Sequence, residues 1–144
     1  MPMDRITLTH LRMPIVSHFE TSFGRIFDRD CILITIYDQG LVGYGECAAD
    51  RDPGYAYETS GTAWHILKDF ILPAIQGQNI ETPEDFREYV KNIKGHEMAK
   101  AGVEMAIWDL LGKKKDQSLQ TLFGYQTKPK VKVGVSVGLQ DTPD

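Results

Sequence analysis

Apolar and polar residues alternate with a two-residue period along the first third of the chain, which is the pattern of half-buried β-strands. Residues Arg5 to Met13 alternate β-branched with polar side chains, and Pro14 is expected to end this strand. Cys31 to Tyr37 is rich in strand-forming residues. Asp38-Gln39-Gly40 has the composition of a tight turn, so Leu41 to Cys47 is predicted to return as the next strand of a hairpin.

Two polar stretches interrupt this alternation. Val16 to Asp30 contains too many polar residues and glycines for a regular element, and Ala48 to Tyr55 is rich in turn-forming residues. Both are predicted to be irregular, and long connections of this kind often carry function. If the hairpin turn centres on Gln39, Cys31 and Cys47 lie roughly opposite each other, and two buried thiols are expected rather than a disulfide.

From residue 57 onward the apolar residues recur with the period of helices. Tyr57 to Leu72 is predicted to form a helix that Pro73 ends. Thr82, followed by a proline and two acids, is predicted to cap a second helix that runs to about Ile93. Glu97 to Lys115 is predicted to be the longest helix, with its terminal lysines at the negative end of the helix dipole. The stripe predicted for its buried face comprises Met98, Ala101, Met105, Trp108 and Leu111 or Gly112.

The order of the elements, strands first and helices afterwards, indicates an α+β domain. Val131 to Val137 then has the alternation of one further strand with a valine face. Because a lone strand has no partner after it in the sequence, we expect it to begin a second domain. The chain is therefore divided into residues 1–125 and residues 126–144.

Composition and charge limit the classes of partner. The chain has 144 residues, 42% of them hydrophobic, as in an ordinary soluble domain. The net charge of −4 argues against nucleic acid as a partner, and the longest apolar run is far shorter than a membrane span requires. Because the N-terminus lacks the pattern of a signal peptide and there are only two cysteines, the expected location is the cytoplasm.

Few residues have the spacing of a catalytic or metal site. The histidines at positions 10, 18, 65 and 96 do not have zinc-site spacing, and phosphate-binding loops and nucleophile elbows are absent from the sequence. Glu46 and Asp50 come nearest to a catalytic pair of carboxylates, and Lys130 and Lys132 are interpreted as solvated lysines at the start of a strand. From the residues alone, these side chains are therefore interpreted as structural or solvent-exposed rather than as catalytic groups or metal ligands.

The predicted long helix and the residues after it carry a motif. Residues Ala99 to Gly124, AKAGVEMAIWDLLGKKKDQSLQTLFG, resemble a signature of the mandelate racemase and muconate-lactonizing branch of the enolase superfamily. Ile107 departs slightly from the usual leucine or alanine. Tyr55 to Pro73 and Lys94 to Ala101 are most similar to the group of o-succinylbenzoate synthases and N-acylamino acid racemases. The positions that match the signature are Glu104, Ala106, Asp109, Gly112, Lys113, Leu119, Leu122 and Gly124.

This resemblance implies a two-domain plan and a type of reaction. An α+β capping domain, a three-stranded antiparallel meander followed by helices, closes over a modified TIM barrel that supplies the chemistry. Enzymes of this branch remove a proton alpha to the carboxylate of a small substrate, and Mg²⁺ stabilises the enediolate. The implied intact protein is a lyase or isomerase, expected as a homo-oligomer, that either forms o-succinylbenzoate in menaquinone synthesis or racemises N-acylamino acids.

The resemblance also indicates which residues would contact the substrate. Thr21 and Phe23 lie in a segment similar to the family's first mobile loop, and Tyr55 lies in the stretch where the second is expected. Ser136 lies near the exit of the first barrel strand, where barrel active sites are built. A complete barrel needs roughly 250 residues, so we expect residues 126–144 to supply only its first strand. The catalytic bases and the Mg²⁺ ligands are then expected outside this chain.

Other functions fit the same pattern. Within the superfamily, a dipeptide epimerase or a muconate cycloisomerase remains open. Outside enzymes, the chain is open to interpretation as a binding domain that keeps the fold of the cap without its chemistry.

Overall fold

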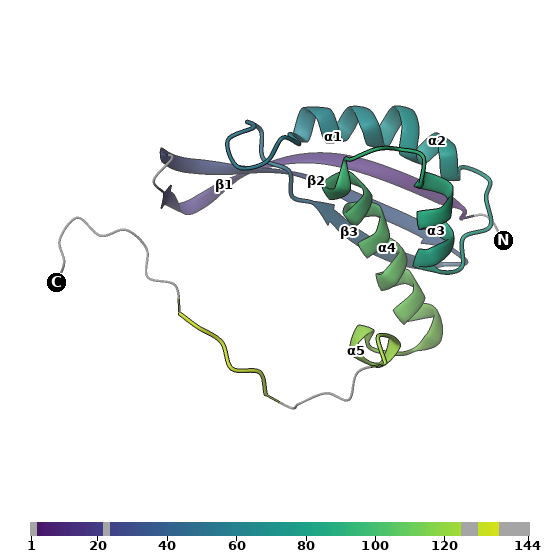
Figure 1. Ribbon diagram of the computed structural model, residues 1–144. Coiled ribbons are helices and arrows are strands. Elements are labelled where there is room, and N and C mark those ends of the chain that lie inside the picture. The colour runs from purple at the N-terminus through teal and green to yellow at the C-terminus, as the bar shows by residue number, and fades with distance from the viewer. Residues whose placement is uncertain (1–2, 22–23, 125–129, 136–144) are drawn as a thin grey trace.

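The computed structural model describes residues 3–21, 24–124 and 130–135. Three antiparallel strands form one sheet in the order β1-β2-β3, and the helices pack on one face of it (Figure 1). The strands are β1 (Arg5–Thr21), β2 (Gly24–Asp38) and β3 (Leu41–Cys47). Ile32, Ile34 and Ile36 of β2 are fully buried at the centre of the core. The predicted α+β meander is confirmed.

The turn between β2 and β3 has two residues, as the sequence predicts. Gln39 (φ 51°) and Gly40 (φ 79°) both adopt left-handed backbone, which suits a tight hairpin. The register pairs Cys47 with Ile32, the neighbour of Cys31, so the two cysteines lie roughly opposite each other, as predicted, with an offset of one residue. Because side chains alternate between faces, the two thiols point to opposite faces. Both are free and buried, and burial raises the pKa of each thiol.

The predictions that Pro14 ends the first strand and that Val16 to Asp30 is irregular are wrong. β1 continues to Thr21 and β2 begins soon after it, so both strands extend past the helices as a hairpin (Figure 1). Pro14 is tolerated because β1 is an outer strand and its register shifts between Pro14 and Phe19, where regular pairing is interrupted. We call the described residues 14–21 and 24–28 the hairpin arm.

One continuous helix follows β3 in three segments: α1 (Ser60–Ile66), the π-helical η1 (Leu67–Ile71) and α2 (Leu72–Ile75). It begins later than the predicted Tyr57, because Thr59 caps it with its side chain. The prediction that Pro73 ends this helix is wrong. The Leu72 amide donates to the Leu67 carbonyl, five residues back, and this wider turn accommodates the proline, which has no N–H of its own.

The remaining helices are α3 (Pro83–Val90), α4 (Glu97–Lys115) and α5 (Leu119–Leu122). The predicted cap of α3 is confirmed: the Thr82 side chain accepts a bond from the Asp85 amide, and the Asp85 carboxylate accepts one from the Thr82 amide. α3 ends at Val90, earlier than the predicted Ile93. The predicted bounds of α4 are confirmed.

The stripe predicted for the buried face of α4 is wrong at Ala101 and Met105, which are exposed. Met98 and Trp108 are half-buried, and Gly112 is buried. A β-carbon at Gly45 of β3 would lie 2.0 Å from the Gly102 carbonyl oxygen, and one at Gly43 would meet α4 almost as closely. The helix therefore packs backbone against backbone on β3 and buries its small residues rather than its largest ones. The residues that α4 buries are Ala99, Gly102, Val103, Ala106, Ile107, Leu110 and Gly112.

The strand predicted from Val131 to Val137 is described only as far as residue 135. Residues 130–135 form neither a helix nor a paired strand, and Val131, Val133 and Val135 are exposed. The assignment of residues 126–144 to a second domain stays a prediction. None of the helices in the described ranges combines the length and apolar character needed to cross a membrane.

Candidate functional site

The hairpin arm projects from one end of the sheet and is held by ion pairs between its strands (Figure 1). At its base, Arg12 donates to Asp28 Oδ2 over 2.6 Å, and toward its tip Arg25 Nε donates to Glu20 Oε2 over 2.9 Å. The hydrogen bond from Arg12 lowers the pKa of the Asp28 carboxyl and raises the pKa of the Arg12 guanidinium. These charges neutralise one another, so the arm offers little net charge to a ligand.

The arm exposes apolar side chains instead. Val16 is fully exposed, Phe19 is 58% exposed and Phe27 is 63% exposed. The ring of His18 lies 5.9 Å from that of Phe27, between centroids. Because Phe19 pairs with Ile26, Phe19 and Phe27 point to opposite faces of the hairpin, so the arm offers an exposed aromatic side chain on each face rather than one continuous patch.

The second part of the candidate site is the segment of residues 48–57, which we call the second loop. Arg29 of β2 approaches Asp50 at its start, with 3.9 Å between Nη1 and Oδ1. The Asp50 carbonyl accepts a bond of 2.8 Å from the Ser60 amide at the start of α1. Tyr55 in this loop is 88% exposed. The second loop is therefore attached near the base of the hairpin arm, and we call the two together the rim.

The far end of the second loop is fixed by a buried carboxylate. Glu58 accepts hydrogen bonds from the amides of Met98 (2.9 Å) and Ala99 (3.1 Å), at the first turn of α4. His96, at the N-cap position of that helix, adopts a left-handed φ of 57° and makes no side-chain capping bond. Glu58 thus supplies the cap that the local sequence does not, and it ties the loop to α4.

A buried aspartate joins the base of the arm to the helices. Asp30 Oδ2 lies 3.1 Å from His10 Nε2 and accepts a bond of 3.2 Å from Ser60 Oγ. The His10 ring in turn lies 6.1 Å from that of Trp64 in α1, between centroids. These contacts join the base of the arm to α1, and both Ser60 and Asp30 are buried.

The structure brings two of the four predicted substrate contacts to the rim. Thr21 pairs with Gly24 at the tip of the arm, and Tyr55 lies in the second loop. The two predicted contacts therefore lie on different segments of the rim. Phe23 and Ser136 lie outside the described residues, and their roles stay predictions.

Glu46 and Asp50 do not form the carboxylate pair that the sequence suggested as a remote option. Glu46 is exposed on β3, whereas Asp50 faces Arg29. Within the described ranges, no group of three histidine, cysteine, aspartate or glutamate side chains lies close enough to hold a metal ion. The described rim therefore fits a Mg²⁺ ion poorly, and we derive no metal-assisted step from it.

Sequence reasoning missed the residues that build the rim. Phe19 and Phe27 lie among polar residues whose pattern indicates an irregular connection, so the sequence does not single them out as site residues. Arg29 and Glu58 gave no local signal, because their partners are distant along the chain, Glu58 by 40 residues from Met98.

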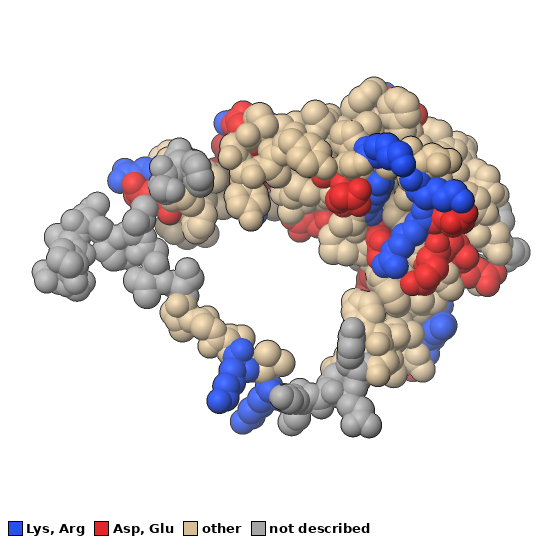
Figure 2. Space-filling model, viewed as in Figure 1, with Lys and Arg blue, Asp and Glu red and all other residues tan. Residues whose placement is uncertain are grey.

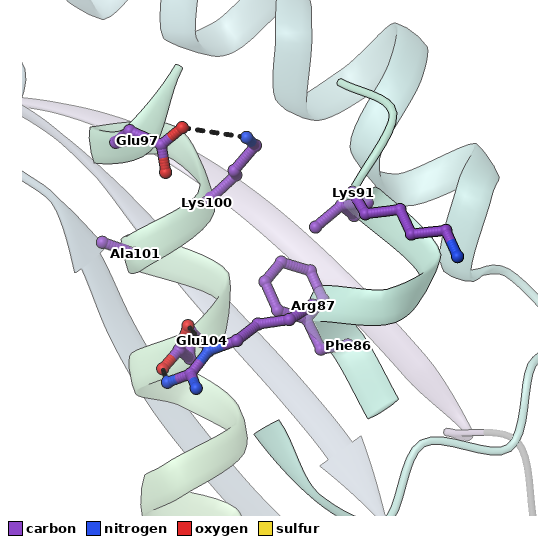
Figure 3. A pocket seen from close by; sticks show the side chains of 8 residues that line it. Phe86, Arg87, Lys91, Glu97, Lys100, Ala101 and Glu104 are labelled. Atoms are coloured by element: carbon purple, nitrogen blue, oxygen red, sulfur yellow. Dashed lines mark hydrogen bonds and ion pairs between the residues drawn. The ribbon is translucent and has the colours of Figure 1, made fainter. Parts of the chain in front are cut away.

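The signature residues of α4 lie away from the rim and hold the domain together. A groove of about 410 Å³ separates α3 from α4 (Figure 3). Across it, Arg87 binds both carboxylate oxygens of Glu104, which lowers the pKa of Glu104 and raises that of Arg87. Lys100 donates to the Ile93 carbonyl (2.7 Å) and to Glu97 (3.0 Å). Acidic and basic side chains are interleaved over these helices (Figure 2), so the groove is internally neutralised.

Comparison with known proteins covers the sheet, the rim and the helices together. The family model described as the N-terminal domain of mandelate racemase / muconate lactonizing enzyme matches residues 4–124. The chain is 40% identical to the o-succinylbenzoate synthase of Listeria innocua over 97% of its own length and 37% of that protein. It is 36% identical to the N-succinylamino acid racemase of Thermus thermophilus over 97% of its length and 38% of that protein.

Among solved structures, a member of the enolase superfamily from Listeria innocua superposes with a TM-score of 0.88 at 38% identity. The match covers 98% of this chain and 38% of the other. The chain thus spans less than two fifths of the length of these relatives. Because the family model matches residues 4–124, the chain belongs to the mandelate racemase / muconate lactonizing enzyme family, as its N-terminal α+β domain.

Proposed function

We propose that this chain is the capping domain of an o-succinylbenzoate synthase or N-succinylamino acid racemase, and that its rim shapes the substrate pocket of the intact enzyme. The observation that carries the proposal is the 40% identity to an o-succinylbenzoate synthase across 97% of the chain. In this proposal residues 1–125 form the cap and residues 126–144 lead into the first strand of a barrel. The intact enzyme is cytoplasmic and homo-oligomeric, and as a synthase it serves menaquinone synthesis.

The proposed reaction begins with removal of a proton alpha to a carboxylate. Enolase-superfamily enzymes use Mg²⁺ to stabilise the resulting enediolate. The described part of this chain has no cluster of three metal-binding side chains, and its rim charges are paired with one another. We therefore assign the base and the metal ligands to the rest of the intact protein, and we expect the 144-residue chain alone to be inactive.

The rim would then choose between substrates by shape and by apolar contact. Phe19, Phe27 and Tyr55 are all more than half exposed, and the second loop that carries Tyr55 is fixed at both ends. One methylene group more or less in an apolar pocket changes selectivity by about 10–200-fold. We propose that Thr21, Phe23, Tyr55 and Ser136 contact the substrate, and that the rim distinguishes a cyclohexadiene carboxylate from an N-acylamino acid.

A chimaera tests this function. In the Listeria innocua synthase, the N-terminal segment that matches this chain is replaced by this chain, and both activities are measured with Mg²⁺ present. We expect no turnover by the 144-residue chain and synthase or racemase turnover by the chimaera. Tyr55→Ala in the chimaera should change KM for one substrate relative to the other, whereas the control Tyr89→Ala on α3, 40% exposed, should not.

Two results would refute the proposal. Turnover by the 144-residue chain alone would place the chemistry inside it. A chimaera that folds and binds Mg²⁺, yet is inactive with both substrates, would favour a binding domain without catalytic function.

A further inference from the structure

The outer edge of β3 is occupied by two side chains of α4. β3 is the last strand of the sheet, so the backbone groups on its outer side have no neighbouring strand among the described residues. The Tyr44 amide donates to Asp109 Oδ2 over 2.8 Å, and Lys113 Nζ donates to the Val42 carbonyl over 2.6 Å. Lys113 Nζ and Asp109 Oδ2 are themselves 2.6 Å apart, at positions i and i+4 of the helix.

These two contacts reproduce the hydrogen bonds of a strand. The Val42 carbonyl and the Tyr44 amide flank Gly43, and one residue of a parallel neighbouring strand would bind this same pair of groups. The Asp109 carboxylate takes the place of that residue's C=O, and the Lys113 ammonium takes the place of its N–H. Most exposed i,i+4 ion pairs contribute little to the stability of a protein. This pair, however, also satisfies one hydrogen-bond donor and one acceptor of the β3 backbone.

The β3 edge would otherwise be open to strand pairing. An exposed edge strand is a template for another chain, and proteins protect such edges with charges, bulges or covering elements. Here the two bonding side chains remain partly accessible, 34% for Asp109 and 41% for Lys113, so α4 reaches the edge without burying it. Tyr44 itself is 51% exposed beside it.

The favoured occupant of an open edge is a second copy of the same strand. In an antiparallel pair of β3 strands centred on Tyr44, Glu46 of one copy faces Val42 of the other. Like charges therefore do not meet across the pair, and Tyr44 faces Tyr44, an aromatic pair of the kind that stabilises sheets. We propose that Asp109 and Lys113 form an edge latch, which prevents β3 from pairing with the β3 of a second copy of this chain.

A charge-neutral double variant tests the edge latch. Asp109→Ala with Lys113→Met removes one acid and one base, so the net charge stays at −4. We expect the dissociation constant for self-association, from sedimentation velocity over a concentration series, to fall by roughly tenfold or more relative to the parent chain. The Tyr44 amide should exchange its hydrogen faster than in the parent when dilute, and more slowly as concentration rises.

The matched control is Arg87→Met with Glu104→Ala, which is also charge-neutral and removes an ion pair of α4 that lies away from the β3 edge. It should leave self-association at the parent level. Adding Tyr44→Pro to the double variant removes the outward N–H that a pairing strand needs, and should restore the parent's association.

Three results would overturn the edge latch. The first is a double variant that associates no more strongly than the parent chain. The second is a control pair that associates as strongly as the double variant. The third is a double variant that still associates strongly when Tyr44→Pro is added. If circular dichroism shows the double variant unfolded, Lys113→Met alone is measured, because the bond between Asp109 and Tyr44 then remains. That variant should associate more strongly than the control, and failure to do so would equally overturn the proposal.

Discussion

Replacing Gly45 by alanine would test the backbone contact between β3 and α4. The added β-carbon would lie 2.0 Å from the Gly102 carbonyl oxygen and 2.6 Å from the Ala106 amide nitrogen. Both are backbone atoms of α4, so no side-chain rotation relieves the overlap. An ordinary contact begins at 3.4 Å, so the Gly102 carbonyl must move away by about 1.4 Å (3.4 minus 2.0), which opens gaps in a core that is otherwise closely packed.

The size of the effect follows from that shift. Overpacking a core typically destabilises a protein by about 1–3 kcal/mol. Because the obstructing atoms are backbone and α4 buries its small face along β3, we expect the upper end, about 3 kcal/mol. The whole stability of such a domain is about 5–15 kcal/mol. For a domain of this size the loss corresponds to a fall in Tm of about 10 °C.

Urea and thermal unfolding followed by circular dichroism measure this loss. The control is Gly54→Ala, since a β-carbon there meets no atom within 4 Å and the residue does not have a positive φ. Alanine at that position should leave stability unchanged or raise it by about 0.5 kcal/mol. Adding Ala106→Gly to Gly45→Ala should not restore the lost stability, because the atom nearest to the added β-carbon is the Gly102 carbonyl oxygen. Equal stability of the Gly45→Ala and Gly54→Ala proteins would refute the reasoning.

Three further predictions concern buried and paired groups. Glu58→Ala should cost about 1–2 kcal/mol in urea unfolding, because two amides at the start of α4 lose their acceptor, and hydrogen exchange should quicken there first. Arg87 lowers the pKa of Glu104, so the pair stabilises the fold above the ordinary carboxyl pKa near 4.5, and this is lost as the pH falls through the lowered value. Arg87→Met should therefore reduce the urea midpoint at pH 7 more than at pH 3, and equal reductions would contradict this. Burial raises the pKa of Cys31 and Cys47, so Ellman's reagent should label neither at pH 8 until urea unfolds the chain, and rapid labelling of the native protein would disprove it.

Local signals were sufficient for the elements whose ends depend on nearby residues. The turn at Gln39 and Gly40, the cap at Thr82 and the full extent of α4 were all predictable, because each depends on contacts within a few positions. The two prolines show where local reasoning fails. Pro14 and Pro73 both carry strong local penalties, but an outer strand with a shifted register tolerates the first and a π-turn tolerates the second.

The face of α4 required knowledge of its partner. Hydrophobicity ranks Met105 and Trp108 above Gly102 and Ala106, yet the strand beneath the helix carries glycines, and only small residues allow the close contact that follows. The contacts that hold the rim could not be predicted from the sequence pattern for a related reason. Glu58 binds amides 40 residues or more away, and a pattern of hydrophobicity contains no information about such pairs.

The hairpin arm has a consequence for how this domain tolerates mutation. β1 and β2 run from the part of the sheet that the helices cover into an arm that no helix covers. The same pair of strands therefore contains positions where mutation strongly affects folding and positions where it has almost no effect. Where the helices cover the sheet, Ile34 of β2 is fully buried and its truncation would leave a cavity, whereas exposed side chains such as Val16 and Phe27 can change with almost no effect on folding. Random libraries confined to residues 15–21 and 25–28 should therefore return mostly folded proteins, and new selectivity can be sought there without first adding stability elsewhere.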